Sequence, residues 1–366
     1  MIVLLPPVLG QHILYEQAPP PVENRGPSDT APQLIALRPG AVMCSGIVEE
    51  PVGRELPIPT AQRLFSTEPI RPITLAFSID ASGRPIDIRD TVGTRRQPWI
   101  DASDAVPALA AWRFAPGAPR RRCTLTYTVD HLHAPDVPIE DAYRAFAFRR
   151  GNSPDMAPFY RLTIPAGSDC FDPFPAYRMQ AYPPYDRLGQ RPGTVSYAMI
   201  GYDVNRHGQT RRVRLLGGDR DAPLARAALR AIRKTRFVPD ARHGCALPFR
   251  MYPRAPLAAP PAPPVEQYRT ADADCEGVPT GWVSMPPLVF PPGFTRRSIE
   301  GWAIIRFDVA PWGATGDVSV AAAEPAAAFG EAAKSIIASA TKAPSKRGFS
   351  GCVEMVKFKM RPPRGG

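Results

Sequence analysis

The sequence lacks long apolar runs and the common catalytic motifs. None of its 366 residues falls in an apolar run of 18, the minimum for a membrane-spanning helix, so we predict no membrane span. HExxH, a Walker phosphate loop, GxSxG, GxGxxG and zinc-spaced Cys/His clusters are also missing. These absences predict a protein that is not an enzyme and that uses no cofactor.

Metal ligands are equally scarce. His131 and His133 could share one face of a strand end, but no third ligand accompanies them. The run from Asp272 to Gly277 resembles the start of a calcium loop, yet Val283 stands where a bidentate Glu is required. We therefore predict no metal site.

Lysine is rare, with 6 residues among the 45 basic ones, and the formal net charge is +11. Most of the excess lies in residues 151–270, which carry 18 basic and 9 acidic side chains. We interpret it as a solvated basic surface. An anionic partner such as a lipid headgroup, a cell-wall polymer or nucleic acid is the alternative, and nucleic acid is disfavoured.

What the sequence does contain is a five-point frame, written three times: cysteine, aromatic, glycine, proline, cysteine. Cysteine and aromatic are 33, 32 and 32 residues apart, and glycine and proline are 33, 31 and 31 apart, which indicates one structural unit copied three times. The three copies are Cys44, Phe77, Gly83, Pro116, Cys123; Cys170, Tyr202, Gly208, Pro239, Cys245; and Cys275, Phe307, Gly313, Pro344, Cys352.

The repeat also selects one pairing of the six cysteines. If each copy folds alone, the disulfides are Cys44 with Cys123, Cys170 with Cys245, and Cys275 with Cys352. In the chain-entropy model each is worth about 4 to 5 kcal/mol. Buried thiols or metal ligands are the alternative. Disulfides indicate an oxidising compartment, so we predict a periplasmic or secreted protein, with residues 1–10 as a weak or truncated signal sequence.

Each copy shows the same order of predicted elements. In residues 73–79 apolar and polar side chains alternate, which is typical of a half-buried strand. A turn at Gly83, a second strand, a helix ending near Trp112 and a third strand over 123–129 follow. We therefore predict an α+β fold of three tandem small domains, each a β-β-α-β unit with one helix on a three-stranded antiparallel sheet.

The prolines and the charge changes suggest the boundaries. The prediction is an extended lead-in or signal remnant, a connector with one short helix, a proline-rich spacer and three repeats. The segments are 1–37 lead-in, 38–131 repeat 1, 132–165 connector, 166–253 repeat 2, 254–270 linker and 271–362 repeat 3.

The third strand of each copy is predicted to be a sheet edge. Pro248 cannot donate to a ladder, and the outward Lys357 and Lys359 are typical guards of an exposed edge. In the first copy Thr124, Thr126 and Thr128 leave the edge least guarded. The second copy's helix instead carries a basic stripe formed by Arg226, Arg230, Arg233 and Lys234.

The repeat resembles the TonB C-terminal domain family. The matching residues are Ile299, Glu300, Gly301, Phe307, Asp308, Val309 and Gly313 for the family's "IEG" and "FDV…G"; Trp112, Arg113, Phe114, Pro116, Arg236, Phe237 and Pro239 for "WRF.P"; and Tyr182, Pro183, Phe290 and Pro291 for "YP". The resemblance implies a helix on a three-stranded sheet whose edge strand pairs with the TonB box of an outer-membrane transporter, a case of strand addition. In the third copy Ala340 and Lys342 replace the "WRF" aromatics.

Three functional hypotheses follow. The first is a non-catalytic periplasmic protein that binds a protein or peptide, such as a TonB-dependent transporter, by strand addition. The second is an energy transducer component whose membrane anchor is missing because the start is misplaced. The third is a binder of peptidoglycan or another anionic surface through Arg226, Arg230, Arg233 and Lys234.

Overall fold

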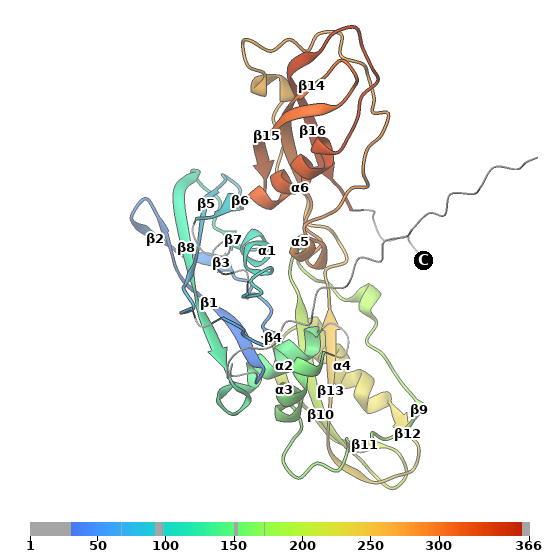
Figure 1. The fold of residues 1–366 in the computed structure, drawn as a ribbon. Coiled ribbons are helices and arrows are strands. Elements are labelled where there is room, and N and C mark those ends of the chain that lie inside the picture. Colours follow the sequence, from blue (N-terminus) through green and yellow to red (C-terminus); the bar gives the residue numbers. More distant parts are fainter. Residues whose placement is uncertain are drawn as a thin grey trace, which may run out of the picture.

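The chain forms an α+β fold whose three larger antiparallel sheets are each covered by a helix (Figure 1). The computed structural model describes residues 31–66, 68–91, 97, 99–149, 153–171 and 173–360. The predicted signal segment and most of the predicted lead-in lie outside these residues. In Figure 1 the first sheet lies on the left, the second below and the third above. We call each sheet with its helix a unit.

The first unit has the largest sheet, with strand order β2-β1-β8-β5-β6 and β4 paired to β1. Helix α1 packs on the face formed by alternate residues of β5, as the period-two pattern predicts, and Pro107 lies within the helix's first turn. The bounds are β1 (Gln33–Cys44), β2 (Ile47–Glu49), β4 (Thr60–Gln62), β5 (Ile73–Ile79), β6 (Pro85–Asp90), α1 (Ala105–Ala110) and β8 (Arg120–Leu132), with a separate pair β3 (Pro51–Gly53) and β7 (Arg113–Phe114).

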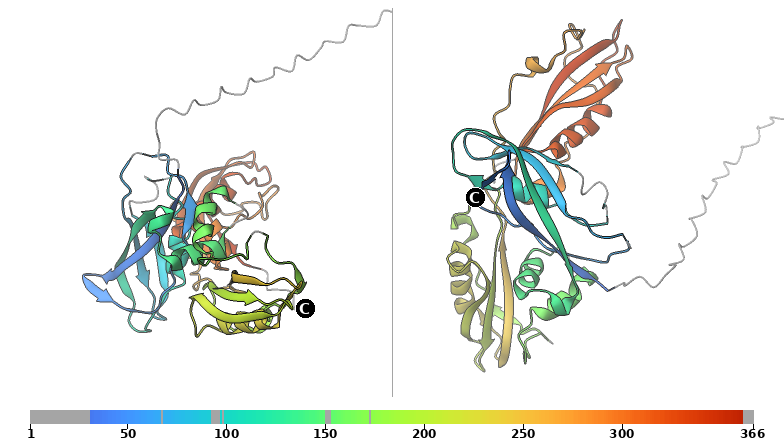
Figure 2. Two further views of the ribbon diagram at one scale, coloured as in Figure 1. Left: turned by 90° about the horizontal axis from the view of Figure 1, so that it is seen from below. Right: turned by 90° about the vertical axis from the view of Figure 1, so that its left-hand side faces the viewer.

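The second unit has the order β11-β10-β13, with the amphipathic helix α4 on one face. Its other face is covered by α2 and α3, which come from the predicted connector (Figure 2). Tyr143, Phe146 and Phe159 of these helices share an apolar cluster with Met199 and Ala246 of the sheet. The bounds are α2 (Ile139–Phe148), α3 (Ala157–Leu162), β10 (Ser196–Val204), β11 (Thr210–Gly218), α4 (Pro223–Lys234) and β13 (Arg242–Met251), with a separate pair β9 (Tyr177–Met179) and β12 (Arg236–Phe237).

The third unit has the order β15-β14-β16, with α6 on one face. The predicted spacer 254–270 lies against this unit: Trp302 Nε1 donates to the Pro260 carbonyl at 2.9 Å, and Arg306 Nη2 donates to that of Tyr268 at 2.8 Å. Two side chains of β14 therefore bind carbonyls of the predicted linker. The bounds are α5 (Pro292–Arg296), β14 (Gly301–Val309), β15 (Thr315–Glu324), α6 (Ala327–Ala338) and β16 (Phe349–Phe358).

The units also pack on one another. The apolar cores of the first and third units are continuous, whereas the second unit has a core of its own. At the contact between β6 and the end of β15, Ile88 N donates to the Pro325 carbonyl at 3.0 Å. Asp87 N donates to Glu324 Oε2 at 2.7 Å.

A buried ion cluster joins all three units beside α5, near the centre of Figure 1. The Arg297 side chain is fully buried, with Nε and Nη2 donating to the two Asp104 oxygens at 2.9 and 2.7 Å. Its Nη1 donates to Glu55 Oε2 at 3.2 Å and to the carbonyl of Gly193, in the second unit, at 3.4 Å. A buried charge is stable only when it is paired, so this cluster fixes how the units meet.

Candidate functional site

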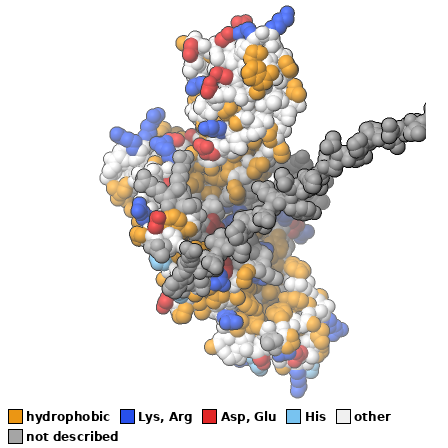
Figure 3. Space-filling view, viewed as in Figure 1, with side chains coloured by type: hydrophobic (Ala, Val, Ile, Leu, Met, Phe, Trp, Pro, Cys, Tyr) orange, Lys and Arg blue, Asp and Glu red, His pale blue; other side chains and the backbone are white. Residues whose placement is uncertain are grey.

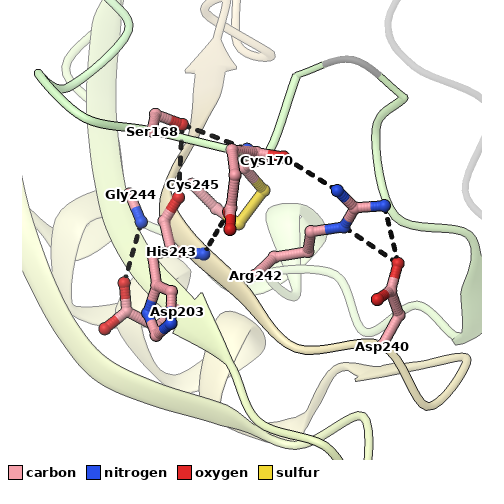
Figure 4. Close-up of a disulfide and its surroundings, with 9 residues drawn as sticks. Ser168, Cys170, Asp203, Asp240, Arg242, His243, Gly244 and Cys245 are labelled. Atoms are coloured by element: carbon pink, nitrogen blue, oxygen red, sulfur yellow. Dashed lines mark hydrogen bonds and ion pairs between the residues drawn. A yellow bond between two sulfur atoms is a disulfide. The ribbon is translucent and has the colours of Figure 1, made fainter.

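The three predicted disulfides are present, with sequence separations of 79, 75 and 77 residues. They indicate an oxidising compartment outside the cytoplasm. Each one joins a cysteine near the start of a unit to a cysteine in β8, β13 or β16. We call these three strands, which follow the helix of each unit, the third strands. In the second unit Asp169 N donates to the His243 carbonyl at 3.2 Å. Gly244 N donates to Asp203 Oδ1 at 2.9 Å (Figure 4).

The glycine of the repeat is explained by a close backbone contact. Gly83, Gly208 and Gly313 have φ of 83°, 73° and 93°, a region that favours glycine. Their carbonyls accept from the amides of Phe114, Phe237 and Lys342 at 2.9, 2.8 and 2.8 Å. A Cβ at any of them would clash with the facing carbonyl oxygen, so the hairpin turn and the helix end meet where no side chain fits.

The third unit replaces the missing aromatic with a lysine and a tryptophan. Lys342 Nζ lies 4.1 Å from the ring centroid of Trp282, and this ring packs against Phe307 at 5.6 Å. In the first and second units Phe114 and Phe237 face Phe77 and Tyr202 instead. The cation–π contact lets a buried lysine take the place of an aromatic ring.

The predicted open edge of the first unit is closed. Strand β1 pairs with β8 over nine residue pairs, from Leu34 opposite Leu132 to Cys44 opposite Cys123. Thr124 lies opposite Met43 and Thr128 opposite Arg38, so Thr124, Thr126 and Thr128 do not form a free edge. The prediction was wrong because residues 33–37, assigned to the lead-in, belong to a strand.

The first unit also shows which backbone groups of a third strand face outward. The Arg122 carbonyl, directly before Cys123, accepts from Ser45 N at 3.2 Å. Backbone groups alternate along a strand, so those of Cys123 face β5 and those of Thr124, Thr126 and Thr128 face β1. Gly244 and Gly351 directly precede the cysteines of β13 and β16, as Arg122 precedes Cys123 in β8, and all three have a positive φ, of 68°, 65° and 52°.

The equivalent edges of the second and third units are open. By this correspondence the outward groups belong to Ala246, Pro248 and Arg250 in β13 and to Val353, Met355 and Lys357 in β16. Each of these strands pairs with one neighbour, and no described backbone group bonds the outward side of these six residues. Pro248 fits, because a proline facing outward costs no ladder bond.

A cavity of about 450 Å³ runs along the open edge of β13. The side chains of Leu247, which packs on the core below α4, and of Ala246, which packs against α2, both line it. Because side chains from both faces line it, the cavity follows the strand's edge. Its other walls are Phe146, Ala147, Arg149, Tyr160, Phe171, Phe174, Pro248 and Arg250, and we call it the edge groove.

A row of aromatic rings forms the wall of the edge groove opposite β13. Ring centroids are 4.8 Å apart for Phe146 and Tyr160, 5.8 Å for Tyr160 and Phe171, and 6.3 Å for Phe171 and Phe174. Phe171 follows Cys170, so the disulfide to Cys245 holds it beside β13. Hydrophobic side chains gather over the lower body in Figure 3, where the second unit lies.

Two arginines, Arg149 and Arg250, line the edge groove. Arg149 lies 4.1 Å over the Phe146 ring, and Arg250 Nη1 donates to the Ala147 carbonyl at 3.0 Å. Burial, and then the charge of Arg250, lower the pKa of Arg149. Among the described residues neither arginine has a carboxylate within ion-pair distance.

The other predicted site residues lie apart. Lys357 is exposed on β16, and Lys359 is paired with Glu300 at 2.7 Å. Arg226, Arg230, Arg233 and Lys234 are all exposed on α4, on the side opposite the buried stripe. The structure therefore brings neither group into the edge groove.

The aromatic residues of the edge groove were missed because they come from the predicted connector and from the start of repeat 2. The only signal was the apolar period of residues 139–148, which predicted a short helix but not its position on the second sheet.

No protein-family model and no curated protein sequence matches this chain. Within the described part of the chain, no helix combines the length and hydropathy needed to cross a membrane.

Proposed function

We propose that this protein binds an extended segment of a partner protein by strand addition at the open edge of β13, with β16 as a second edge. The pairing of β1 with β8 carries the proposal, because in the first unit it adds a strand to the edge that is equivalent to the open edge of β13 in the second. An added strand gains backbone hydrogen bonds, and the walls of the edge groove receive alternate side chains.

The proposed setting is the periplasm, and the proposed role is non-catalytic. The resemblance to the TonB C-terminal domain supports a partner linked to TonB-dependent transport, since that family uses the equivalent edge. The disulfides support an oxidising compartment. An energy transducer component with its anchor outside this sequence stays an alternative proposal.

Amide hydrogen exchange tests strand addition at the backbone. Peptides selected on the full-length oxidised protein from a random library are added to isotopically labelled protein. We expect the outward amides of Ala246 and Arg250 to exchange more slowly, while those of Cys245 and Leu247, already facing β10, change little. Binding that leaves the outward amides unprotected would contradict strand addition.

The exposed stripe on α4 favours a second candidate function, binding to an anionic polymer such as peptidoglycan. None of Arg226, Arg230, Arg233 and Lys234 is in an ion pair with a described residue. Binding through this stripe should weaken in Arg230→Gln/Arg233→Gln and with added salt. Sedimentation with purified peptidoglycan measures it, and salt-independent binding would exclude the stripe.

A further inference from the structure

The edge groove combines an apolar wall with two cations. The residues that line it and the adjoining cavity beside α3 include Phe146, Tyr160, Phe171 and Phe174, and none of the described lining residues is acidic. A site of this size with a few polar groups on an apolar wall is typical of a ligand site. An entirely apolar partner would leave the charges of Arg149 and Arg250 unpaired.

Both arginines have donors to spare. Arg149 Nη1 donates to the Phe146 carbonyl at 3.1 Å, and Arg250 Nη1 donates to the carbonyls of Ala147 and Arg149 at 3.0 and 3.4 Å. These bonds to the end of α2 hold each guanidinium in place. A guanidinium carries five N–H donors, and the Nε and Nη2 groups of both arginines have no acceptor among the described residues.

The local charge is also uncompensated. Arg149 is partly buried, and its pKa is lowered by burial first and by Arg250 second, so the two cations disfavour one another. An anion placed between them would remove this repulsion and would accept charge-assisted bonds. The carboxylate of an aspartate or glutamate is the anion that an added peptide strand can supply.

We propose that the edge groove selects a peptide strand in which an acidic residue lies among apolar or aromatic residues. Arg149 and Arg250 bind the carboxylate, and the row from Phe146 to Phe174 takes the apolar side chains. This inference rests on the proposed function and adds the chemistry of the partner to it. Phe146, Arg149 and Tyr160 come from the predicted connector, outside the repeats that resemble a TonB C-terminal domain, whereas Phe171, Phe174 and Arg250 lie within repeat 2.

Selection from a library of random decapeptides tests the inference. The library is selected on the full-length oxidised protein and, in parallel, on Arg149→Gln/Arg250→Gln. We expect aspartate and glutamate to be enriched with the parent protein and not with the double variant. Arg211→Gln, an exposed change on β11, which β10 separates from β13, is the matched control and should select the same peptides as the parent.

One selected acidic peptide is then synthesised with its carboxylate and with the corresponding amide. Replacing the carboxylate should weaken binding to the parent at least about tenfold, as the loss of a charge-assisted hydrogen bond predicts. The glutamine double variant should bind both peptides equally. Arg149→Lys/Arg250→Lys, which keeps the charge, should recover part of the preference, and unchanged thermal unfolding checks that the variants fold.

The outcomes separate the two proposals. If peptides bind and protect the outward amides of β13 without any preference for acidic residues, the carboxylate inference is overturned and strand addition stands. If the acidic preference survives in the glutamine double variant, the assignment to Arg149 and Arg250 is overturned. If no peptide is selected at all, both proposals fail.

Discussion

The first unit and the other two are built on one plan, yet the third strand has two neighbours in the first and one in the others. In the first unit β1 runs directly into Cys44 and lies along β8. In the second and third units the segment before the first cysteine does not form a strand along the third strand. Its backbone bonds to that strand are limited to one residue pair, Asp169 with His243 and Asp274 with Ser350, among the described residues. The segment before the first cysteine therefore decides whether an edge is filled or open.

The units also differ in what covers the second face of the sheet. Helices α2 and α3 cover it in the second unit, and residues 254–270 contact it in the third. In the second unit this cover does more than bury apolar surface, because it builds the aromatic wall of the edge groove. Helices α2 and α3 of the connector thus line the cavity beside the edge of β13.

Removing Asp104 should have the largest effect on stability, because Asp104 belongs to the buried ion cluster that joins the three units. Asp104→Ala leaves Arg297 buried without its bidentate partner, and we expect a loss of about 3 to 5 kcal/mol in the free energy of unfolding. Asp104→Leu/Arg297→Leu removes both charges and should cost less. Chemical denaturation measures both, and equal losses would show that the unpaired charge is not the cause.

Alanine at the repeated glycines tests whether the three units share one backbone contact. Gly83→Ala, Gly208→Ala and Gly313→Ala each place a Cβ against a facing carbonyl oxygen, and we expect losses of about 3 kcal/mol. Gly46→Ala, at φ 88° with nothing within 4 Å of the new Cβ, is the control and should cost about 1 kcal/mol. Thermal unfolding measures the differences. Three unequal losses would mean that the three units do not share this backbone contact.

Proline at matched outward positions contrasts the filled and open edges directly. Thr128→Pro removes an amide that faces β1, whereas Lys357→Pro removes the equivalent amide on the open edge of β16, as Pro248 does naturally in β13. We expect a loss of about 2 to 3 kcal/mol for Thr128→Pro and less than about 1 kcal/mol for Lys357→Pro. Both side chains are exposed, so side-chain burial does not differ. Equal losses in urea unfolding would mean that the two edges are alike.

Much of the unit could be predicted from the sequence, because its signals are local. The alternation in β5 and the apolar stripe of α4 are repeated features of short segments, and the repeat itself selected the three disulfides. Pro248 correctly marked an edge, because a missing donor is a property of one residue.

The edge groove could not be predicted, because it depends on contacts between distant segments. The predicted boundary between residues 37 and 38 divides residues 33–44, which the structure forms into one strand with a bulge between Pro39 and Val42. Likewise, nothing local to α2 indicates that Phe146 and Arg149 meet β13, about a hundred residues later in the chain. Only the packed structure brings them together.

The smallest predicted effect concerns Glu324, which joins the first and third units. Burial, and next the charge of Asp87, raise the pKa of Glu324 from 4.5 to about 7, against the opposing hydrogen bond from Asp87 N. A carboxyl whose pKa is raised by folding binds its proton more tightly in the folded state. Its contribution to stability is therefore full below about pH 4.5, falls as the pH rises, and is lost above about pH 7.

Glu324→Gln keeps an acceptor for Asp87 N and removes the charge. We expect the variant to be more stable than the parent by about 1 to 2 kcal/mol at pH 8.5, and the gain to vanish near pH 5. Glu331→Gln, an exposed change on α6, should show no such pH dependence. Urea unfolding at the two pH values measures the difference. A gain that is the same at both pH values would mean that ionisation of Glu324 does not weaken the contact between β6 and β15.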